Sequence, residues 1–197
     1  MKSFLSDLKP ALLLTLVFAV VLCGAYPLAV WAGGQLLFPA RANGSLVVDL
    51  SGTVRGSRLL AQNFSSPGTF HPRPSAAGTG YDATNSSGSN LGPTSAALAE
   101  RIKAAVVAYR AENHLAPDAP VPADAVTTSA SGLDPDISVA NALLQAARVA
   151  RARGLPLETV RALVAKTVQQ PDLGILGEAR VNVLLLNLAL GRIAKGR

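Results

Sequence analysis

The sequence predicts a single N-terminal transmembrane helix followed by an α+β soluble domain, in which a small sheet accompanies about four helices. Three observations predict this architecture. An uncharged apolar run is long enough to cross a bilayer, short apolar runs between glycine and serine turns follow it, and apolar residues later recur at helical spacing. We therefore divide the chain into a short N-terminal segment, 1–10, a transmembrane helix, 11–32, and a soluble domain, 33–197.

The composition excludes several classes of protein. The chain has 197 residues, of which 49% are hydrophobic and 15% charged, and it is too apolar for a disordered protein. One cysteine and two histidines are too few for a disulfide framework or a multi-cysteine metal centre, so we expect no metal site. The net charge of +6 is scattered along the chain, which makes nucleic-acid binding a minor interpretation.

The apolar run 11–32 carries the strongest signal. Its 22 residues contain no charge, and as a helix they span about 33 Å, enough for a hydrocarbon core of about 30 Å. Tyr26 and Trp31 lie near its C-terminal end, where aromatic rings favour the headgroup layer. A cleaved signal peptide would need a shorter apolar region, and Leu22 is a poor residue before a lipidated Cys23. We therefore predict an uncleaved span.

The charges that flank the span predict its orientation. Lys2 and Lys9 precede it, whereas Arg41 is the only basic residue in the next 20 positions. Because basic residues favour the cytoplasmic side, the N-terminus is expected inside and the soluble domain outside.

The first part of the soluble domain predicts a small sheet and a long loop. Apolar runs at 45–50 and 58–64, separated by turn residues, are typical of short strands. The stretch 72–95 is rich in Gly, Ser, Asn and Pro and has no periodicity. A polar loop of about 24 residues is uncommon inside a compact domain, so we expect a functional role for it.

Four segments with helical spacing follow. They are a helix capped by Thr94 or Ser95 that ends near His114, a helix from Ser138 to Arg153 ended by Gly154, a helix from 155 to Val168 stopped before Pro171, and a helix over 180–194. The last contains Asn182 and Asn187, whose buried amides would either cap loop backbone, which we favour, or bind a partner.

No motif predicts catalysis. The glycine-rich stretches 78–80 and 87–90 lack the preceding strand and the following lysine of a phosphate-binding loop. Ser129 and Ser131 have no nucleophile-elbow context. Asp134 and Asp136 are more typical of a turn before a capped helix than of a carboxylate pair. We therefore predict a protein that is not an enzyme.

A rigid segment surrounds His71. Pro72 and Pro74 hold His71 and Arg73 in extended backbone. That rigidity is equally consistent with an interaction surface and with a histidine whose hydrogen bonds are made within its own loop.

Several short segments, in order along the whole chain, match one family pattern. They are Asn43-Gly44-Ser45-Leu46-Val47, Gly56-Ser57, Gln62-Asn63-Phe64, Phe70-His71-Pro72-Arg73-Pro74-Ser75, Tyr81-Asp82, Ser89-Asn90-Leu91, Ser131-Gly132-Leu133-Asp134-Pro135, Arg148-Val149-Ala150, Val181-Asn182-Val183 and Leu186-Asn187-Leu188-Ala189-Leu190. Together they resemble the C subunit of the bacterial Kdp potassium-transporting P-type ATPase, the KdpC family.

The resemblance implies a non-catalytic accessory subunit of a high-affinity potassium uptake complex in the bacterial inner membrane. The implied partners are a channel-like potassium-binding subunit, an ATP-hydrolysing P-type subunit and a small membrane subunit. It also implies a catalytic chaperone that assists assembly and raises the ATP affinity of the P-type subunit, with ATP shared rather than firmly bound. Gln169 matches a glutamine proposed to hold the nucleotide, although its place before Pro171 is also that of an ordinary helix end.

The predicted orientation conflicts with direct nucleotide contact, since a periplasmic domain cannot reach cytosolic ATP. We therefore expect the domain to sit over the outer mouth of the channel subunit and to act by coupling between conformations. The loop 72–95 and the segment 70–75 are its expected docking surface, with Phe70, His71, Arg73, Tyr81 and Asn90 as contact residues. The alternatives are a cytosolic nucleotide-binding regulator and a free-standing, membrane-anchored periplasmic scaffold or binding protein.

Overall fold

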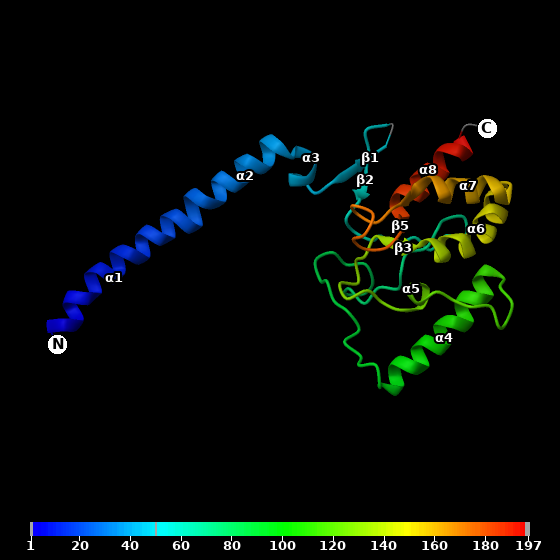
Figure 1. Cartoon of the computed structure of the whole chain (residues 1–197), viewed down its shortest axis with the longest axis horizontal. Helices are drawn as coiled ribbons and strands as arrows, with labels where there is room; N and C mark the ends of the chain where they lie inside the picture. The colour runs from blue at the N-terminus through cyan, green and yellow to red at the C-terminus, as the bar shows by residue number, and fades with distance from the viewer. Residues whose placement is uncertain (1, 50, 196–197) are drawn as a thin grey trace. The chain divides into compact units, whose positions relative to one another are not determined.

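The computed structural model describes residues 2–49 and 51–195, and the chain divides after residue 47 into two compact units. Each unit is described by itself, with element labels as in Figure 1.

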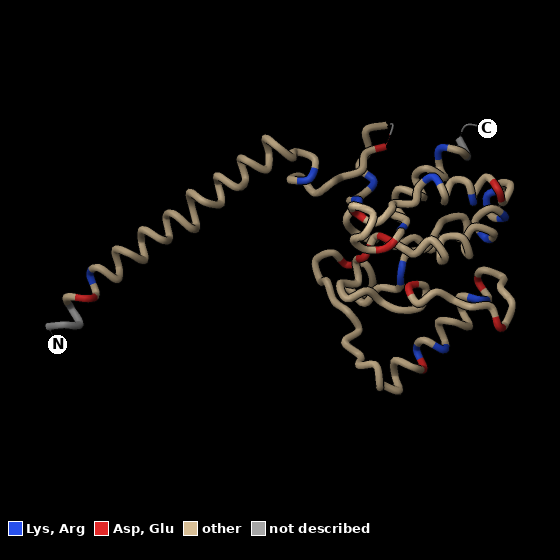
Figure 2. The backbone as a smooth tube through the Cα atoms, in the orientation of Figure 1, with Lys and Arg blue, Asp and Glu red and all other residues tan. Residues whose placement is uncertain are grey.

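The first unit is a long apolar helix. It comprises α1 (Lys2–Val20), a π-helical turn η1 (Val21–Ala25), α2 (Tyr26–Leu37) and the short α3 (Pro39–Ala42). Within Ser6–Leu37 an 18-residue window has a mean hydropathy of 2.4 and contains no buried residue, so by length and composition the stretch can cross a membrane. Figure 2 shows no charged residue along most of this helix. The predicted N-terminal membrane-spanning helix is therefore confirmed as one continuous apolar helix.

The π-helical turn has a local cause in Pro27. Proline has no N–H, and in a regular α-helix its ring would clash with the carbonyl four residues earlier, that of Cys23. The helix widens just before this point, where the N–H of Tyr26 donates to the carbonyl of Val21, five residues back. The helix therefore passes Gly24 and Pro27 without breaking.

The second unit contains helices and small antiparallel sheets, which confirms the predicted α+β class. Its helices are α4 (Ala96–Asn113), α5 (Ala123–Val126), α6 (Val139–Arg153), α7 (Leu157–Thr167) and α8 (Val183–Lys195). Strands β3 (Asp136–Ser138), β4 (Val168–Gln169) and β5 (Arg180–Asn182) form a sheet with β5 in the middle. Strand β1 (Leu46–Val48), at the boundary between the units, pairs with β2 (Val54–Ser57). In the larger sheet Val181 lies opposite both Ile137 and Val168.

The core lies among α6, α7, α8 and the central strand. Its buried members are Phe70, Ile137, Ala142, Ala146, Val149, Ala150, Leu155, Val160, Val164, Val181, Val183, Leu186 and Leu190. Helix α7 packs against both α6 and α8. All of these residues except Phe70 come from the helices, the strands and the connection after α6, whereas Phe70 comes from a segment without regular structure.

The predicted helix ends are confirmed where a side chain or a glycine marks them. The hydroxyl of Ser95 accepts the N–H of Leu98 at 3.4 Å, and that of Ser138 accepts the N–H of Asn141 at 3.1 Å. Gly154 ends α6 with a left-handed φ of 62°.

The strand predictions are partly wrong. The predicted strand at 45–50 contains β1, but residues 58–64 form no strand, and the strand that pairs with β1 is β2, just before them. The predicted helix over 180–194 begins at Val183, because the three residues before it pair as β5. Strands β3 and β4 were likewise predicted as a turn and a helix end. Runs of two or three residues are too short to show a period of two, so only long-range pairing defines them.

Candidate functional site

The segment Ser66–His71, which we call the clasped segment, lies against α6 and α8 without regular backbone pairing. Each of its six carbonyl oxygens nevertheless accepts a side-chain hydrogen bond. The donors are His71 Nε2 to Ser66 (3.0 Å), Arg148 Nη1 to Pro67 (2.7 Å) and Thr69 (3.0 Å), Arg153 Nε to Gly68 (2.6 Å), Asn187 Nδ2 to Phe70 (2.9 Å) and Gln145 Nε2 to His71 (3.1 Å). Side chains therefore replace a neighbouring strand.

Two side-chain amides bind the last two residues of the clasped segment, each through both the N–H and the carbonyl of one residue. Asn187 Oδ1 accepts the N–H of Phe70 at 2.8 Å, and Gln145 Oε1 accepts the N–H of His71 at 2.7 Å. With the carbonyl bonds above, each amide reproduces the paired hydrogen bonds of an antiparallel strand. The preferred interpretation of Asn187, a buried amide that caps loop backbone, is confirmed. Asn182 caps backbone too, because its Nδ2 donates to the carbonyl of Arg58 at 2.9 Å.

Arg148 and His71 form the charged part of this network. Arg148 is 5% exposed, and it also donates to Asn113 Oδ1 at 3.0 Å and Gln145 Oε1 at 2.8 Å. The pKa of His71 is lowered because burial disfavours the imidazolium and the Arg148 charge repels it, against the opposing effects of the Ser66 carbonyl and Glu112, whose carboxylate lies 3.0 Å from Nδ1. Burial and the neighbouring Arg148 cation therefore disfavour the protonated form of His71.

Gln145 and Arg148 are not among the predicted functional residues, although the sequence contains a signal for them. Asn141, Gln145 and Arg148 recur at helical spacing on the side of α6 that carries its buried residues, and all three are at most 5% exposed. Polar residues at core-facing positions indicate buried hydrogen bonding. Their partners are as far as 81 residues away in sequence, so the pattern by itself names no target.

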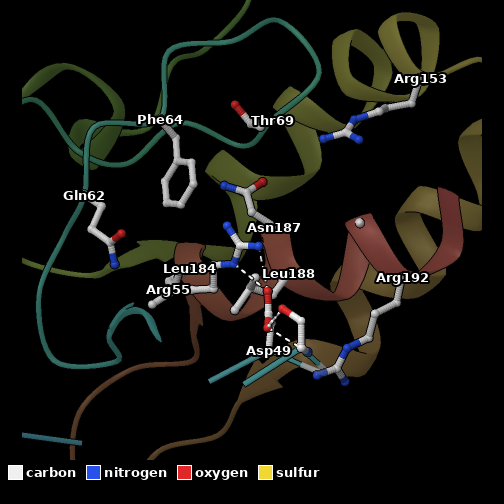
Figure 3. A pocket seen from close by; sticks show the side chains of 12 residues that line it. Asp49, Arg55, Gln62, Phe64, Thr69, Arg153, Leu184, Asn187, Leu188 and Arg192 are labelled. Carbon is white, nitrogen blue, oxygen red and sulfur yellow. Dashed lines mark hydrogen bonds and ion pairs between the residues drawn. The ribbon is translucent and has the colours of Figure 1, made fainter. Parts of the chain in front are cut away.

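A cavity of about 660 Å³ borders the clasped segment and α8, and Figure 3 shows its side chains. It is lined by Asp49, Ser51, Arg55, Gln62, Phe64, Thr69, Arg153, Leu184, Asn187, Leu188, Gly191 and Arg192. Arg55 is paired with Asp49 at 2.6 Å, whereas Arg153 and Arg192 have no carboxylate partner among the described residues. The cavity therefore has a cationic side and an apolar wall, but its lining residues include no histidine, cysteine or second carboxylate for acid–base or nucleophilic chemistry.

The described residues contain no group of three or more His, Cys, Asp or Glu side chains that could hold a metal ion. Asp134 and Asp136 each pair with an arginine, Asp134 with Arg73 at 2.9 Å and Asp136 with Arg180 at 3.2 Å. The pKa of Asp136 is raised, chiefly by burial. The Asp-Pro-Asp segment is a turn that leads into β3, in which Asp134 Oδ1 accepts the N–H of Asp136 at 3.0 Å.

Comparison with known proteins assigns the family. Residues 8–192 match the family model described as the K+-transporting ATPase, c chain. Among similar proteins, the potassium-transporting ATPase KdpC subunit of Caulobacter vibrioides is 58% identical over 94% of this chain and 93% of its own length. The KdpC subunits of Nitratidesulfovibrio vulgaris and Myxococcus xanthus are 54% and 60% identical, over 98% and 90% of this chain and 98% and 84% of their own lengths. The chain belongs to the KdpC family.

The predicted KdpC docking residues have different environments. Phe70 is fully buried in the core, so it is no part of an exposed docking surface, and that prediction is wrong because the clasp turns its ring inward. His71 and Tyr81 are half-buried beside one cavity, and Tyr81 donates to the carbonyl of Arg73 at 2.9 Å. Burial raises the pKa of the Tyr81 hydroxyl. Asn90 is exposed, and within the described part of the chain it forms no hydrogen bond with the other four residues.

Hydrogen bonds join the loop 72–95 to the turn around Gly132. They bring together two of the KdpC-like segments, 70–75 and 131–135. The N–H of Ser87 donates to Ser131 O at 3.0 Å, and the Ser75 hydroxyl donates to Gly132 O at 2.6 Å. Gly132 has a left-handed φ of 67°, and a Cβ there would lie 2.6 Å from both Ala77 N and Ser87 O. The backbones therefore approach so closely that only glycine fits.

Gln169, the predicted nucleotide-binding residue, lies in β4 opposite Arg180 rather than at the end of a helix. Its side chain is half-buried, and it lines none of the three cavities described for this structure. Its role toward ATP stays a prediction.

Proposed function

We propose that this chain is a non-catalytic accessory subunit of a high-affinity, ATP-driven potassium uptake complex. In this role it assists assembly of the complex and raises the ATP affinity of the P-type subunit without hydrolysing ATP itself. The observation that carries the proposal is the match to the c chain of K+-transporting ATPases over residues 8–192, nearly the whole chain. The proposed partners are a channel-like potassium-binding subunit, the ATP-hydrolysing subunit and a small membrane subunit, with ATP not firmly bound to this chain.

The use of polar side chains supports a non-catalytic role. Arg148, Gln145 and Asn187 would be candidates for chemistry by residue type, but their donors are occupied by backbone carbonyls of the clasped segment. A reactive group needs polar atoms that are free to act on a substrate, whereas the amide and guanidinium groups of these side chains are engaged in these hydrogen bonds. Their network stabilises a rigid domain instead.

The proposed orientation is an N-terminus in the cytoplasm and a periplasmic domain, based on Lys2 and Lys9 before the span against Arg41 after it. From that side the effect on ATP is indirect. Contacts that differ between two conformations of the pump shift their populations, and about 1.4 kcal/mol of such a difference changes an affinity tenfold. A few contacts outside the membrane are therefore enough to change the ATP affinity of the pump about tenfold.

Two measurements test this proposal. The first places a single cysteine at the exposed Ala83 in a Cys23→Ser background and treats intact cells with a thiol reagent that cannot cross the inner membrane. Labelling is expected. Labelling only after the inner membrane is opened would place the domain inside and favour the cytosolic nucleotide-binding regulator.

The second measurement compares the KM for ATP of the potassium-stimulated ATPase assembled with and without this chain. A lower KM in the presence of the chain is expected. Failure of the chain to co-purify with any ATPase subunit would favour the free-standing periplasmic scaffold, and an unchanged KM would leave only the assembly role.

A further inference from the structure

The hairpin turn between β4 and β5 carries an unusual group of exposed apolar residues. Leu173, Ile175 and Leu176, which we call the apolar tip, are 89%, 81% and 56% exposed. Elsewhere in the second unit the described large apolar residues that are exposed lie at least five positions apart in sequence, and none is more than 67% exposed; they are Val48, Val54, Leu59, Leu91, Val107 and Leu143. Three large aliphatic side chains within four positions form a patch, which in soluble proteins marks an interaction site.

The apolar tip has a defined backbone. The N–H of Asp172 donates to the carbonyl of Leu176 at 2.9 Å and the reverse bond has the same length, so these two residues close the turn. Gly174 N–H donates to the carbonyl of Pro171 at 3.0 Å. The exposed apolar side chains are therefore carried by a turn whose backbone is fixed by hydrogen bonds.

Leu173 adopts a conformation that its side chain disfavours. Its φ is 55°, in the left-handed region that glycine and asparagine occupy readily and leucine rarely. Strained residues persist where the surroundings determine them, and they cluster at binding and switch regions. The strain aims an aliphatic side chain into solvent, where it contributes nothing to the core.

The base of the hairpin is anchored to the sheet. Arg180 of β5 lies 3.7 Å from the Asp172 carboxylate and 3.2 Å from that of Asp136 in β3. Gln169 of β4 is paired with Arg180. The segment is the loop between α7 and β5 in Figure 1, and it projects from a sheet whose central residue, Val181, is in the core.

We propose that the apolar tip inserts into an apolar recess on another subunit of the potassium-transporting ATPase. This inference rests on the proposed function, which requires such a subunit. The acidic residues of the hairpin define the partner further. Asp172 is exposed, and among the described residues it forms one ion pair, the long one to Arg180, so the rim of the recess is expected to carry a basic side chain that pairs with it.

Charge argues against a lipid surface as the occupant of the tip. Residues 170–179 include Asp172 and Glu178 and no lysine or arginine, so an anionic bilayer surface repels this segment. They also include no tryptophan or tyrosine, the residues that anchor a segment at the headgroup layer. An aliphatic cluster flanked by acidic residues fits a recess on a protein better than it fits a lipid surface.

The proposal gives Gln169 a second explanation. It lies three positions before Asp172 in the strand that carries the hairpin. If a substitution of Gln169 changes ATP affinity, it does so by changing how the apolar tip binds its partner subunit, and Gln169 itself does not contact the nucleotide. Gln169 is then a positioning residue for a subunit contact.

Leu173→Asn tests the proposal without threatening the fold. Asparagine removes the aliphatic surface and accepts a positive φ, so thermal unfolding of the full chain in detergent should be unchanged or higher. Dissociation of the chain from the ATPase complex should become at least about tenfold faster, measured by loss of co-purification over time, since a desolvated aliphatic anchor is lost. Val107→Gln, which removes an aliphatic side chain that is 67% exposed on α4, is the control and should leave dissociation unchanged.

A photo-cross-linking amino acid at Ile175 in the assembled complex identifies the occupant. Cross-links to another ATPase subunit are expected. Cross-links to lipid or to a second copy of this chain would overturn the inference. If the wild-type chain co-purifies but Ile175 cross-links to no subunit and Leu173→Asn changes nothing, the inference is wrong and the proposed function stands. If the wild-type chain does not co-purify, the proposed function itself fails.

Discussion

At the scale of single residues, the clasped segment shows how polar side chains form part of a core. Phe70 is fully buried although its segment has no regular pairing, because Asn187 satisfies both polar groups of its peptide. An unpaired buried donor or acceptor costs about 1–3 kcal/mol, so these hydrogen bonds are required for burial of the ring. Burial of the Phe70 ring and the Asn187 hydrogen bonds therefore depend on each other.

His71 makes the stability of this segment depend on pH. Because the pKa of His71 is lowered in the folded chain, the unfolded chain binds a proton more readily, and stability falls as the pH drops from about 6.5 toward the folded pKa. Above about 6.5 this contribution is constant. The expected result for His71→Gln is lower stability at pH 8, since two contacts are lost, but a flatter dependence between pH 7 and 5.

Denaturant unfolding of the full chain in detergent at several pH values measures this slope. His114→Asn, which replaces the exposed second histidine at a left-handed position, serves as the control and should keep the wild-type slope. An equal slope in His71→Gln and wild type would mean that His71 is not the titrating group.

Gly132→Ala should destabilise the second unit strongly. The left-handed backbone alone costs a non-glycine residue about 1–3 kcal/mol, and the added Cβ would meet backbone atoms of Ala77 and Ser87 that cannot move as a side chain can. Gly154→Ala separates these two effects, because Gly154 has a φ of 62° with nothing within 4 Å of the added carbon. Its measured loss in unfolding free energy should be clearly smaller, and similar losses in the two variants would show that the close approach carries no energy.

At the scale of elements, the apolar helix and the domain helices form for different reasons. The stretch Ser6–Leu37 presents apolar side chains all round and buries none of them in the protein, so the bilayer takes the place of a core. Helix α6 instead separates a buried side, which includes Val149, from an exposed one and ends at a glycine. The apolar helix needs only sufficient length and an apolar composition, whereas α6 also needs other elements to pack against.

Leu14→Arg should therefore prevent assembly of the complex. A charge near the centre of a membrane-spanning helix costs about 2.5–3.5 kcal/mol on the insertion scale, and Leu14 is an exposed residue of the apolar stretch. Complex yield in the membrane fraction measures the effect. Val107→Arg on the exposed side of α4 is the matched control with wild-type yield, and normal yield from Leu14→Arg would contradict a single membrane span.

At the scale of the whole molecule, the function proposed for the chain depends on contacts outside itself. Its polar clusters are occupied in holding the clasped segment and the loop 72–95, while its most exposed aliphatic surface outside the apolar helix is the apolar tip. A domain built this way would contribute shape and rigidity to an assembly. Under the proposed function, coupling to ATP passes through changes in the partner subunits.

Gln169→Ala tests this coupling directly. If Gln169 positions the hairpin, any rise in the KM for ATP should stay within about threefold and should be accompanied by faster dissociation of the chain from the complex. Both quantities are measured on the same preparation, with Leu173→Asn as the reference for a lost docking contact. A large rise in KM without faster dissociation would restore direct nucleotide contact by Gln169.

The sequence by itself determined the features that depend on neighbouring residues. The apolar run, the helices and the caps at Ser95, Ser138 and Gly154 are local patterns, and the family-like segments named the relatives. Tertiary structure alone decided the three short strands of the larger sheet and the inward turn of Phe70. It also decided which carbonyls the polar side chains of α6 and α8 would bind, because donors and acceptors more than 70 residues apart meet only when the chain has folded.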